Sequence, residues 1–142
     1  MKVSFQYNPK IYQIECDLIV FYGKYITPAS KFCRNVYINT SDGIIKAQTN
    51  KVNVTDILFT KRGNDARNID QIFGFVRSKK YKKIAVPFFI YQDVRSDLEI
   101  ELSYMSKFLE NNDIEVIIYY FDKEIIEDNR DIFEKYKIEI KD

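Results

Sequence analysis

The feature that most constrains the fold is a strand, a loop, a helix and a second strand in the second half of the chain. The apolar residues 84–86 follow a polar turn and end at Pro87, which has no amide proton to continue regular strand pairing. A helical pattern covers residues 96–111, and residues 113–121 form the most strongly strand-forming run. Two strands joined by a helix over this length make a parallel crossover. We therefore expect residues 84–86 and 115–120 to be parallel neighbours in one sheet.

The first half of the chain predicts mostly strands. Val3, Phe5 and Tyr7 alternate with polar residues, which is typical of a half-exposed strand, and the continuous apolar run at 17–22 is typical of a strand buried on both faces. Asp-Gly at positions 42 and 43 lies between two β-prone runs and predicts a hairpin. Further elements are expected as a strand over 51–60, a helix that begins at Asn64 or Asp65 with Ile69, Ile72, Phe73 and Val76 on one face, and a last helix capped by Asp122.

Strands mixed with helices over 142 residues favour a single domain, residues 1–142, with one core. The pattern predicts an α/β protein, a three-layer α/β/α sandwich with a mixed, largely parallel central sheet. Ser96 and Glu99 have the spacing of a capping box for the helix at 96–111, and Leu98, Leu102, Met105 and Leu109 give it an apolar stripe.

Composition excludes several classes of function. The chain has no histidine, which removes the usual general base near neutral pH and most catalytic zinc sites. The 22 basic and 21 acidic residues nearly balance, with a net charge of +1, which does not favour binding to nucleic acid or to an anionic membrane. Cys16 and Cys33 have no metal-binding spacing and fit a reducing compartment, and no apolar run approaches the length of a membrane span. We expect a cytoplasmic protein with no metal and no cofactor.

Two stretches of the chain resemble the macrodomain, the ADP-ribose-binding α/β/α fold. Residues 11–20, Ile-Tyr-Gln-Ile-Glu-Cys-Asp-Leu-Ile-Val, are similar to the early macrodomain run in which a short helix leads into Asp-Ala-Ile-Val. Residues 83–87, Lys-Ile-Ala-Val-Pro, and residues 114–122 are similar to the family's Ile-Ala-Phe-Pro strand and its final Val-rich strand, which a helix joins. The resemblance implies a macrodomain-like fold that binds ADP-ribose or a related nucleotide.

The functional motifs of that family are replaced here. Where macrodomains carry Gly-Asp-Ile, whose Asp contacts adenine, this chain has Pro9-Lys10-Ile11. Where they carry Asn-Ala-Ala-Asn beside the distal ribose, it has Phe21-Tyr22-Gly23-Lys24. The family's glycine-rich second phosphate loop corresponds to residues 90–95, which contain no glycine. Bulky and cationic groups therefore stand where the family uses glycines to close backbone amides on a pyrophosphate.

Ligands of open α/β sheets bind at the carboxyl ends of parallel strands, which places the candidate site. Cations and a helix start near Asn64 suit phosphate, and Tyr22, Tyr91 or Phe121 suit stacking on a base. The alternative is that these are ordinary loop residues. The candidate ligand-binding residues are Tyr22, Gly23, Lys24, Lys61, Arg62, Gly63, Asn64, Tyr91, Gln92, Phe121 and Asp122.

Other charged groups have simpler explanations. The basic run at residues 77–83 surrounds Tyr81 and is compatible with nucleic-acid contact, but a solvated turn at the amino-terminal edge of the sheet explains it as well. The carboxylates Asp93, Asp97, Glu99 and Glu101 suggest acid–base chemistry or a metal, whereas the helix dipole alone favours acidic residues in a first turn. Neither cysteine has a histidine partner to make it a nucleophile.

The sequence favours a binding protein over an enzyme, with no catalytic residue assigned. Our first hypothesis is a macrodomain-like protein that binds a nucleotide or an ADP-ribose-related ligand without turning it over. The alternative is a protein–protein interaction module on the same scaffold, with a cleft filled by large side chains such as Phe21, Phe88 and Phe89. We expect no membrane partner and no nucleic-acid partner.

Overall fold

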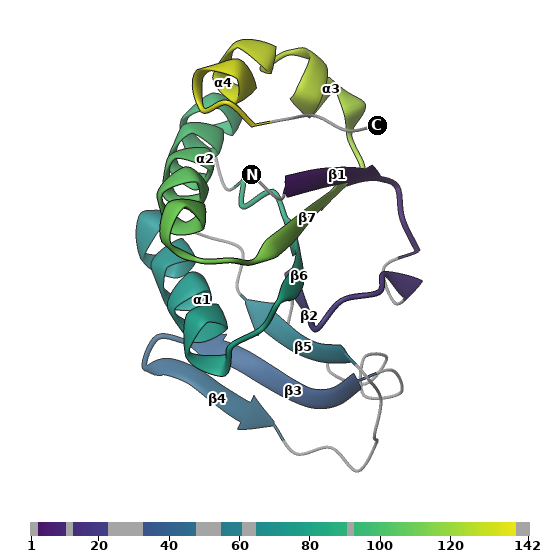
Figure 1. Cartoon of the computed structure of the whole chain (residues 1–142), viewed down its shortest axis with the longest axis vertical. Helices are drawn as coiled ribbons and strands as arrows, with labels where there is room; N and C mark the ends of the chain where they lie inside the picture. The colour runs from purple at the N-terminus through teal and green to yellow at the C-terminus, as the bar shows by residue number, and fades with distance from the viewer. Residues whose placement is uncertain are drawn as a thin grey trace.

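The computed structural model describes residues 3–10, 13–22, 33–47, 55–60, 65–90 and 93–138. This part of the chain contains seven strands and four helices around one sheet (Figure 1). In chain order they are β1 (Val3–Tyr7), β2 (Leu18–Tyr22), β3 (Cys33–Thr40), β4 (Gly43–Ala47), β5 (Thr55–Thr60), α1 (Asp65–Lys79), β6 (Lys83–Pro87), α2 (Val94–Asn111), β7 (Glu115–Tyr120), α3 (Lys123–Glu127) and α4 (Arg130–Lys135).

The sheet has the order β1-β7-β6-β2-β5-β3-β4, and every neighbouring pair is parallel except β3 and β4. The predicted α/β class with a mixed, largely parallel sheet is therefore confirmed. β6 and β7 are parallel neighbours, paired from Lys83 with Glu115 to Pro87 with Tyr119, and α2 joins them. The crossover expected from the sequence is present and lies between the edge strand β1 and the central strand β2 (Figure 1).

The predicted hairpin is also present, at the edge of the sheet farthest from β1. β3 and β4 pair antiparallel, and Thr40 lies opposite Gly43 across a two-residue turn. Gly43 has φ of 128°, a backbone conformation that residues with a side chain rarely adopt. The Thr40 hydroxyl donates a hydrogen bond to the Gly43 carbonyl at 2.8 Å. The Asp-Gly signal thus places a turn that requires glycine.

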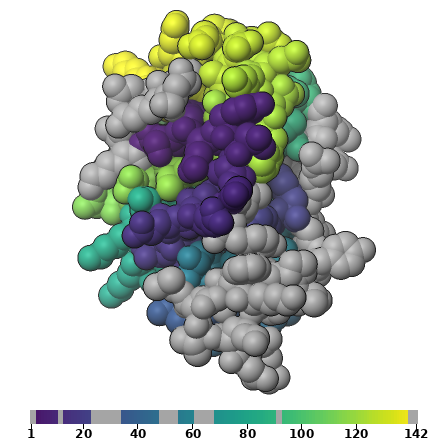
Figure 2. All heavy atoms as spheres, turned by 90° about the vertical axis from the view of Figure 1, so that its right-hand side faces the viewer, coloured from purple at the N-terminus to yellow at the C-terminus, as the bar shows by residue number. Residues whose placement is uncertain are grey.

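The described helices all lie on one side of the sheet (Figure 1). Each of them contributes buried apolar residues to one core, in which the Phe73 ring of α1 meets the Phe108 ring of α2 at a centroid distance of 4.9 Å. On the opposite face, Ile14 and Cys16 from the connection between β1 and β2 pack against Ile19 and neighbouring strand residues. Figure 2 shows this N-terminal segment, in purple, running over that face.

Helix α2 begins two residues earlier than the sequence predicts. Its N-cap is Asp93, whose side chain accepts a hydrogen bond from the Arg95 amide at 3.2 Å, and not Ser96. The Ser96 hydroxyl donates to the second Asp93 carboxylate oxygen at 2.8 Å. Asp93 directly precedes the first apolar residue of the helix, Val94, and aspartate competes well with serine as a cap, so the capping-box interpretation was wrong.

The last helical region is split into two short helices, α3 and α4, where the sequence predicts one. Asp122 caps α3 as expected, accepting from the Glu124 amide at 3.0 Å. α4 buries Phe133 completely, with its ring 5.5 Å from that of Phe5 in β1. Arg95 of α2 pairs with Asp131 of α4 at 2.6 Å. The chain's last helix therefore covers its first strand.

The basic run at residues 77–83 occupies the end of α1 and the turn before β6. The amides of Lys82 and Lys83 donate to the Asp17 carboxylate at 2.9 and 3.0 Å, which fixes the turn beside the start of β2. This is the amino-terminal edge of the parallel sheet, as the sequence suggests. None of the helices in the described ranges has the length and apolar character needed to span a bilayer.

Candidate functional site

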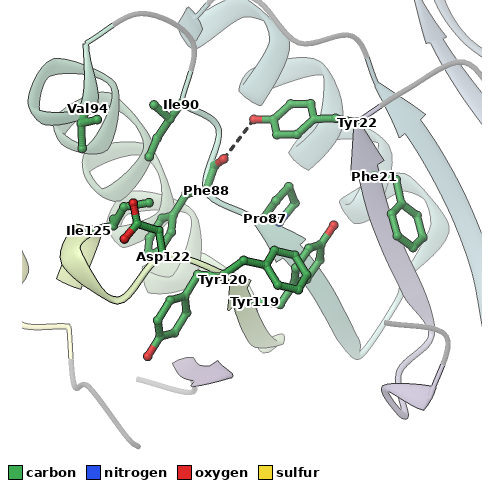
Figure 3. A pocket seen from close by; sticks show the side chains of 11 residues that line it. Phe21, Tyr22, Pro87, Phe88, Ile90, Val94, Tyr119, Tyr120, Asp122 and Ile125 are labelled. Atoms are coloured by element: carbon green, nitrogen blue, oxygen red, sulfur yellow. Dashed lines mark hydrogen bonds between the residues drawn. The ribbon is translucent and has the colours of Figure 1, made fainter. Parts of the chain in front are cut away.

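A cavity of about 510 Å³ lies where β2, β6 and β7 end (Figure 3). The three strands are adjacent and parallel, so their carboxyl ends and the segments that follow them meet at one edge of the sheet. The lining is mostly aromatic and aliphatic, and consists of Phe21, Tyr22, Pro87, Phe88, Ile90, Val94, Tyr119, Tyr120, Phe121, Asp122 and Ile125.

Hydrogen bonds hold the aromatic walls in place. The Tyr22 hydroxyl donates to the Phe88 carbonyl at 3.1 Å, as the dashed line in Figure 3 shows. The Tyr22 ring meets the Phe89 ring edge to face, at a centroid distance of 5.9 Å. On the other side of the cavity, the buried Tyr119 hydroxyl donates to the carbonyl of Val20. The tyrosines thus connect β2 to the segment after β6 and to β7, two strands away, and limit how far this wall moves.

A buried acid lies directly behind the cavity wall. Glu101 of α2 is 0 % exposed, and its Oε2 accepts a hydrogen bond from the Phe89 amide at 3.1 Å. Its Oε1 is buried and has no hydrogen-bond partner among the described residues. Burial raises the pKa of this carboxyl well above its ordinary value; the hydrogen bond from the Phe89 amide opposes this rise, and the charge of the nearby Asp97 adds to it.

The cavity is poor in positive charge. Among the described residues that line it, none is a lysine or an arginine, and Asp122 contributes a carboxylate. One oxygen of Asp122 is used to cap α3, through the Glu124 amide. Arg95, in the first turn of α2, forms hydrogen bonds to Asn129 at 3.0 Å and to Asp131 at 3.2 and 2.6 Å. The described lining therefore offers aromatic faces and one acid.

Three of the predicted site residues line this cavity together. Tyr22 is the last residue of β2, and Phe121 and Asp122 follow directly after β7. Phe121 is 52 % exposed at the rim. The other predicted residues lie outside the described part of the chain: Gly23, Lys24, Lys61, Arg62, Gly63, Asn64, Tyr91 and Gln92.

Sequence reasoning missed several contributors. Tyr119 and Tyr120 read as interior residues of a strand, yet both reach the cavity because β7 ends there. Val94 and Ile125 come from the first turns of α2 and α3, and Figure 3 shows their side chains near Ile90. The available signal was position alone, since each of the two begins a helix that follows a strand.

A second cavity of about 430 Å³ lies between β1 and α3, with Tyr120 in the wall of both cavities. Lys123 and Arg130 line it together with Glu127. The Lys123 ammonium lies 4.6 Å from the centroid of the Tyr7 ring. This pocket therefore carries charges of both signs, and the face of its Tyr7 ring is already in contact with the Lys123 ammonium.

The acidic residues of α2 do not form a common site. Asp93 caps the helix, Glu99 accepts from the Tyr136 hydroxyl at 2.6 Å, and Glu101 is buried behind Phe89. Within the ranges that the structure describes, no three cysteine, aspartate or glutamate side chains gather closely enough to hold a metal ion. Cys16 is a buried free thiol, and burial, followed by the charge of Asp17, raises its pKa to about 12.

Comparison of the chain with protein-family models, with curated proteins and with solved structures gave no match. The functional proposal below therefore rests on the residues and the geometry of this chain.

Proposed function

We propose that the protein binds a nucleotide or an ADP-ribose-related ligand without chemical turnover, with the base of the ligand in the cavity at the ends of β2, β6 and β7. The observation that carries the proposal is the cavity itself: about 510 Å³, lined by aromatic rings, at the carboxyl ends of adjacent parallel strands. That volume suits a nucleoside, and such edges are where open α/β sheets bind ligands.

The lining suggests how a base would be held. Phe121, half exposed at the rim, offers a ring face for stacking, and Asp122 beside it offers a hydrogen-bond acceptor for an amino group. Phosphates of the ligand are assigned to the cations that follow β2 and β5 in the sequence, namely Lys24, Lys61 and Arg62.

A macrodomain-like arrangement is part of the same proposal. Its support is the crossover in which β6 ends at Pro87 and α2 leads into a parallel β7. A turn at Gln13, whose amide donates to the Lys10 carbonyl at 2.9 Å, precedes β2 where the resemblance expects a short helix.

The competing hypothesis, a protein-binding module, supposes that large side chains fill the cleft. Phe21 and Phe88 do lie at the strand ends, but they stand on the walls of a cavity. This arrangement favours a ligand over a filled cleft.

A binding panel tests the proposal. Adenosine, AMP, ADP-ribose and NAD would be titrated by calorimetry, and each ligand would then be recovered and checked for chemical change. We expect at least one to bind below millimolar concentration and to be recovered intact. Because stacking on an aromatic side chain contributes about 1–3 kcal/mol per base, Phe121→Ala should weaken binding by about tenfold or more.

The matched control is Ile45→Ala, which removes a side chain of similar exposure, 54 %, from β4 at the far edge of the sheet. It should leave binding unchanged. Failure of the whole panel to bind, or equal weakening by both variants, would contradict the proposal. Lys24→Ala and Arg62→Ala should weaken only the phosphate-bearing ligands.

A further inference from the structure

The peptide group between Phe88 and Phe89 is held from both sides by side chains. Its carbonyl accepts from the Tyr22 hydroxyl at 3.1 Å, and its amide donates to Glu101 Oε2, also at 3.1 Å. This peptide directly follows β6, at the start of the connection to α2. Its N–H is therefore committed to a buried carboxyl group of the protein and is not available to an anionic ligand.

The start of α2 is occupied in the same way. The Arg95 amide donates to Asp93 Oδ1 at 3.2 Å, and the Ser96 hydroxyl donates to Asp93 Oδ2 at 2.8 Å. A helix N-terminus attracts anions because its amide groups lack partners. Here an exposed carboxylate of the chain already takes that place.

Charge around this part of the cavity adds to the effect. Asp93 lies next to Val94, which lines the cavity, and Asp122 lines it from α3. Arg95, the nearest residue of opposite charge along α2, is engaged by Asp131 and Asn129. An anionic group placed in the cavity would face the Asp122 carboxylate, with the charge of Asp93 close by and no cation from the described lining.

We propose that Asp93, Asp122 and Glu101 are specificity determinants that exclude anionic groups, so that the cavity accepts a planar ring without negative charge. Glu101 acts by occupying the Phe89 N–H group and Asp93 by occupying the Arg95 N–H group, and the charges of Asp93 and Asp122 also repel an anion. This inference rests on the proposed function and deepens it, because it fixes which part of the ligand enters the cavity. The phosphates then lie away from the β6–α2 connection.

Nicotinamide and nicotinate make a matched test, because they differ mainly in an amide replaced by a carboxylate. Each would be titrated into the ¹⁵N-labelled protein at neutral pH, with the amide signals of Phe121 and Ile125 followed by NMR. We expect nicotinamide to shift these signals saturably and nicotinate to bind about tenfold more weakly, as expected for one charge repelled by a nearby carboxylate. Equal or tighter binding of nicotinate would overturn the inference, and so would the absence of a shift with either compound.

Variants test whether the named carboxylates cause the difference in affinity between nicotinamide and nicotinate. Asp93→Asn and Asp122→Asn keep an acceptor for their capping hydrogen bonds and should each narrow the difference between the two compounds. Glu110→Gln, with the same loss of charge at the opposite end of α2, should not. If neither aspartate variant narrows the difference, the assignment is wrong.

Pyrophosphate tests the β6–α2 connection independently of any ring. Titrated against sodium chloride of equal ionic strength, it should leave the Phe89 and Arg95 amide signals unshifted. A saturable shift of either signal would show that the connection binds phosphate and would overturn the inference. The two failures are distinguishable: ADP-ribose binding with such a shift leaves the proposed function standing, whereas absence of binding across the nucleotide panel removes the function itself.

Discussion

Glu101 holds the segment after β6 in place and also lowers the stability of the folded protein. It is a fully buried carboxyl group with one hydrogen bond, to the Phe89 amide, and one oxygen without a partner. An unpartnered buried polar atom costs free energy, and an ionised one costs more. The residue is retained in the core at a thermodynamic disadvantage, which fits a positional role in holding the segment after β6.

The pH dependence of stability should report on this residue. Its pKa in the folded state is raised above the unfolded value near 4.5, so its contribution is fully present below that pH and is lost as pH rises toward the folded pKa. The loss approaches about 1.4 kcal/mol per pH unit. Glu101→Gln cannot ionise, so its free energy of unfolding relative to wild type should increase between pH 5 and pH 8, measured by urea denaturation.

The exposed variant Glu110→Gln provides the comparison, because it removes a carboxyl group from the same helix without altering the core. The difference in free energy of unfolding between Glu110→Gln and wild type should stay constant between pH 5 and pH 8. A Glu101→Gln variant whose difference from wild type also stays constant would show that Glu101 is ionised in the folded protein.

At the scale of elements, α4 is short but central to the packing at the β1 side of the sheet. Phe133 is fully buried, and its ring contacts those of Phe5 in β1 and Phe88 after β6, at centroid distances of 5.5 and 6.0 Å. An isolated helix of this length does not form in water, so its stability must come from these contacts. α4 and β1 therefore depend on each other.

Phe133→Ala should lower the free energy of unfolding by about 3–5 kcal/mol, because it leaves a cavity beside the rings of Phe5 and Phe88. Glu134→Ala, at the exposed neighbouring position, should have little effect. Denaturation of both variants followed by far-UV circular dichroism measures the difference. Equal stability of the two would mean that α4 does not support the core.

At the scale of the whole molecule, the protection of backbone amides from hydrogen exchange should decline from the centre of the sheet to its edges. β2 and β6 are central, with neighbours on both sides, whereas β4 is an edge strand that exposes Ile45. Local opening is easiest where few buried contacts resist it. Native-state hydrogen exchange should therefore find the slowest amides in β2 and β6 and the fastest strand amides in β4. Faster exchange in β6 than in β4 would contradict this order.

The sequence carries much of this architecture because its strongest patterns are local. The crossover from β6 to β7, the Asp-Gly hairpin and the Asp122 cap each follow from a few adjacent residues, and all three are confirmed. The order of the strands is not local: β1 pairs with β7 across most of the chain, and no periodicity encodes that choice.

Part of the candidate site could be predicted from the sequence for the same reason. Tyr22 ends one strand, and Phe121 and Asp122 follow another, so the rule for parallel sheets places them at the edge where the cavity lies. The partners of Glu101 and the occupation of the Phe88–Phe89 peptide depend on how α2 packs. A glutamate one position before Leu102 looks like a surface residue until the helix is placed.

The pairing of the first strand with the last has a consequence for synthesis. During synthesis, β1 emerges from the ribosome long before β7, its partner in the sheet, has been made. Until then the apolar side chains of Val3 and Phe5 have no permanent neighbour. The nascent chain must keep β1 from associating elsewhere, so its maturation should depend more on chaperones that hold emerging chains than on the speed of any single folding step.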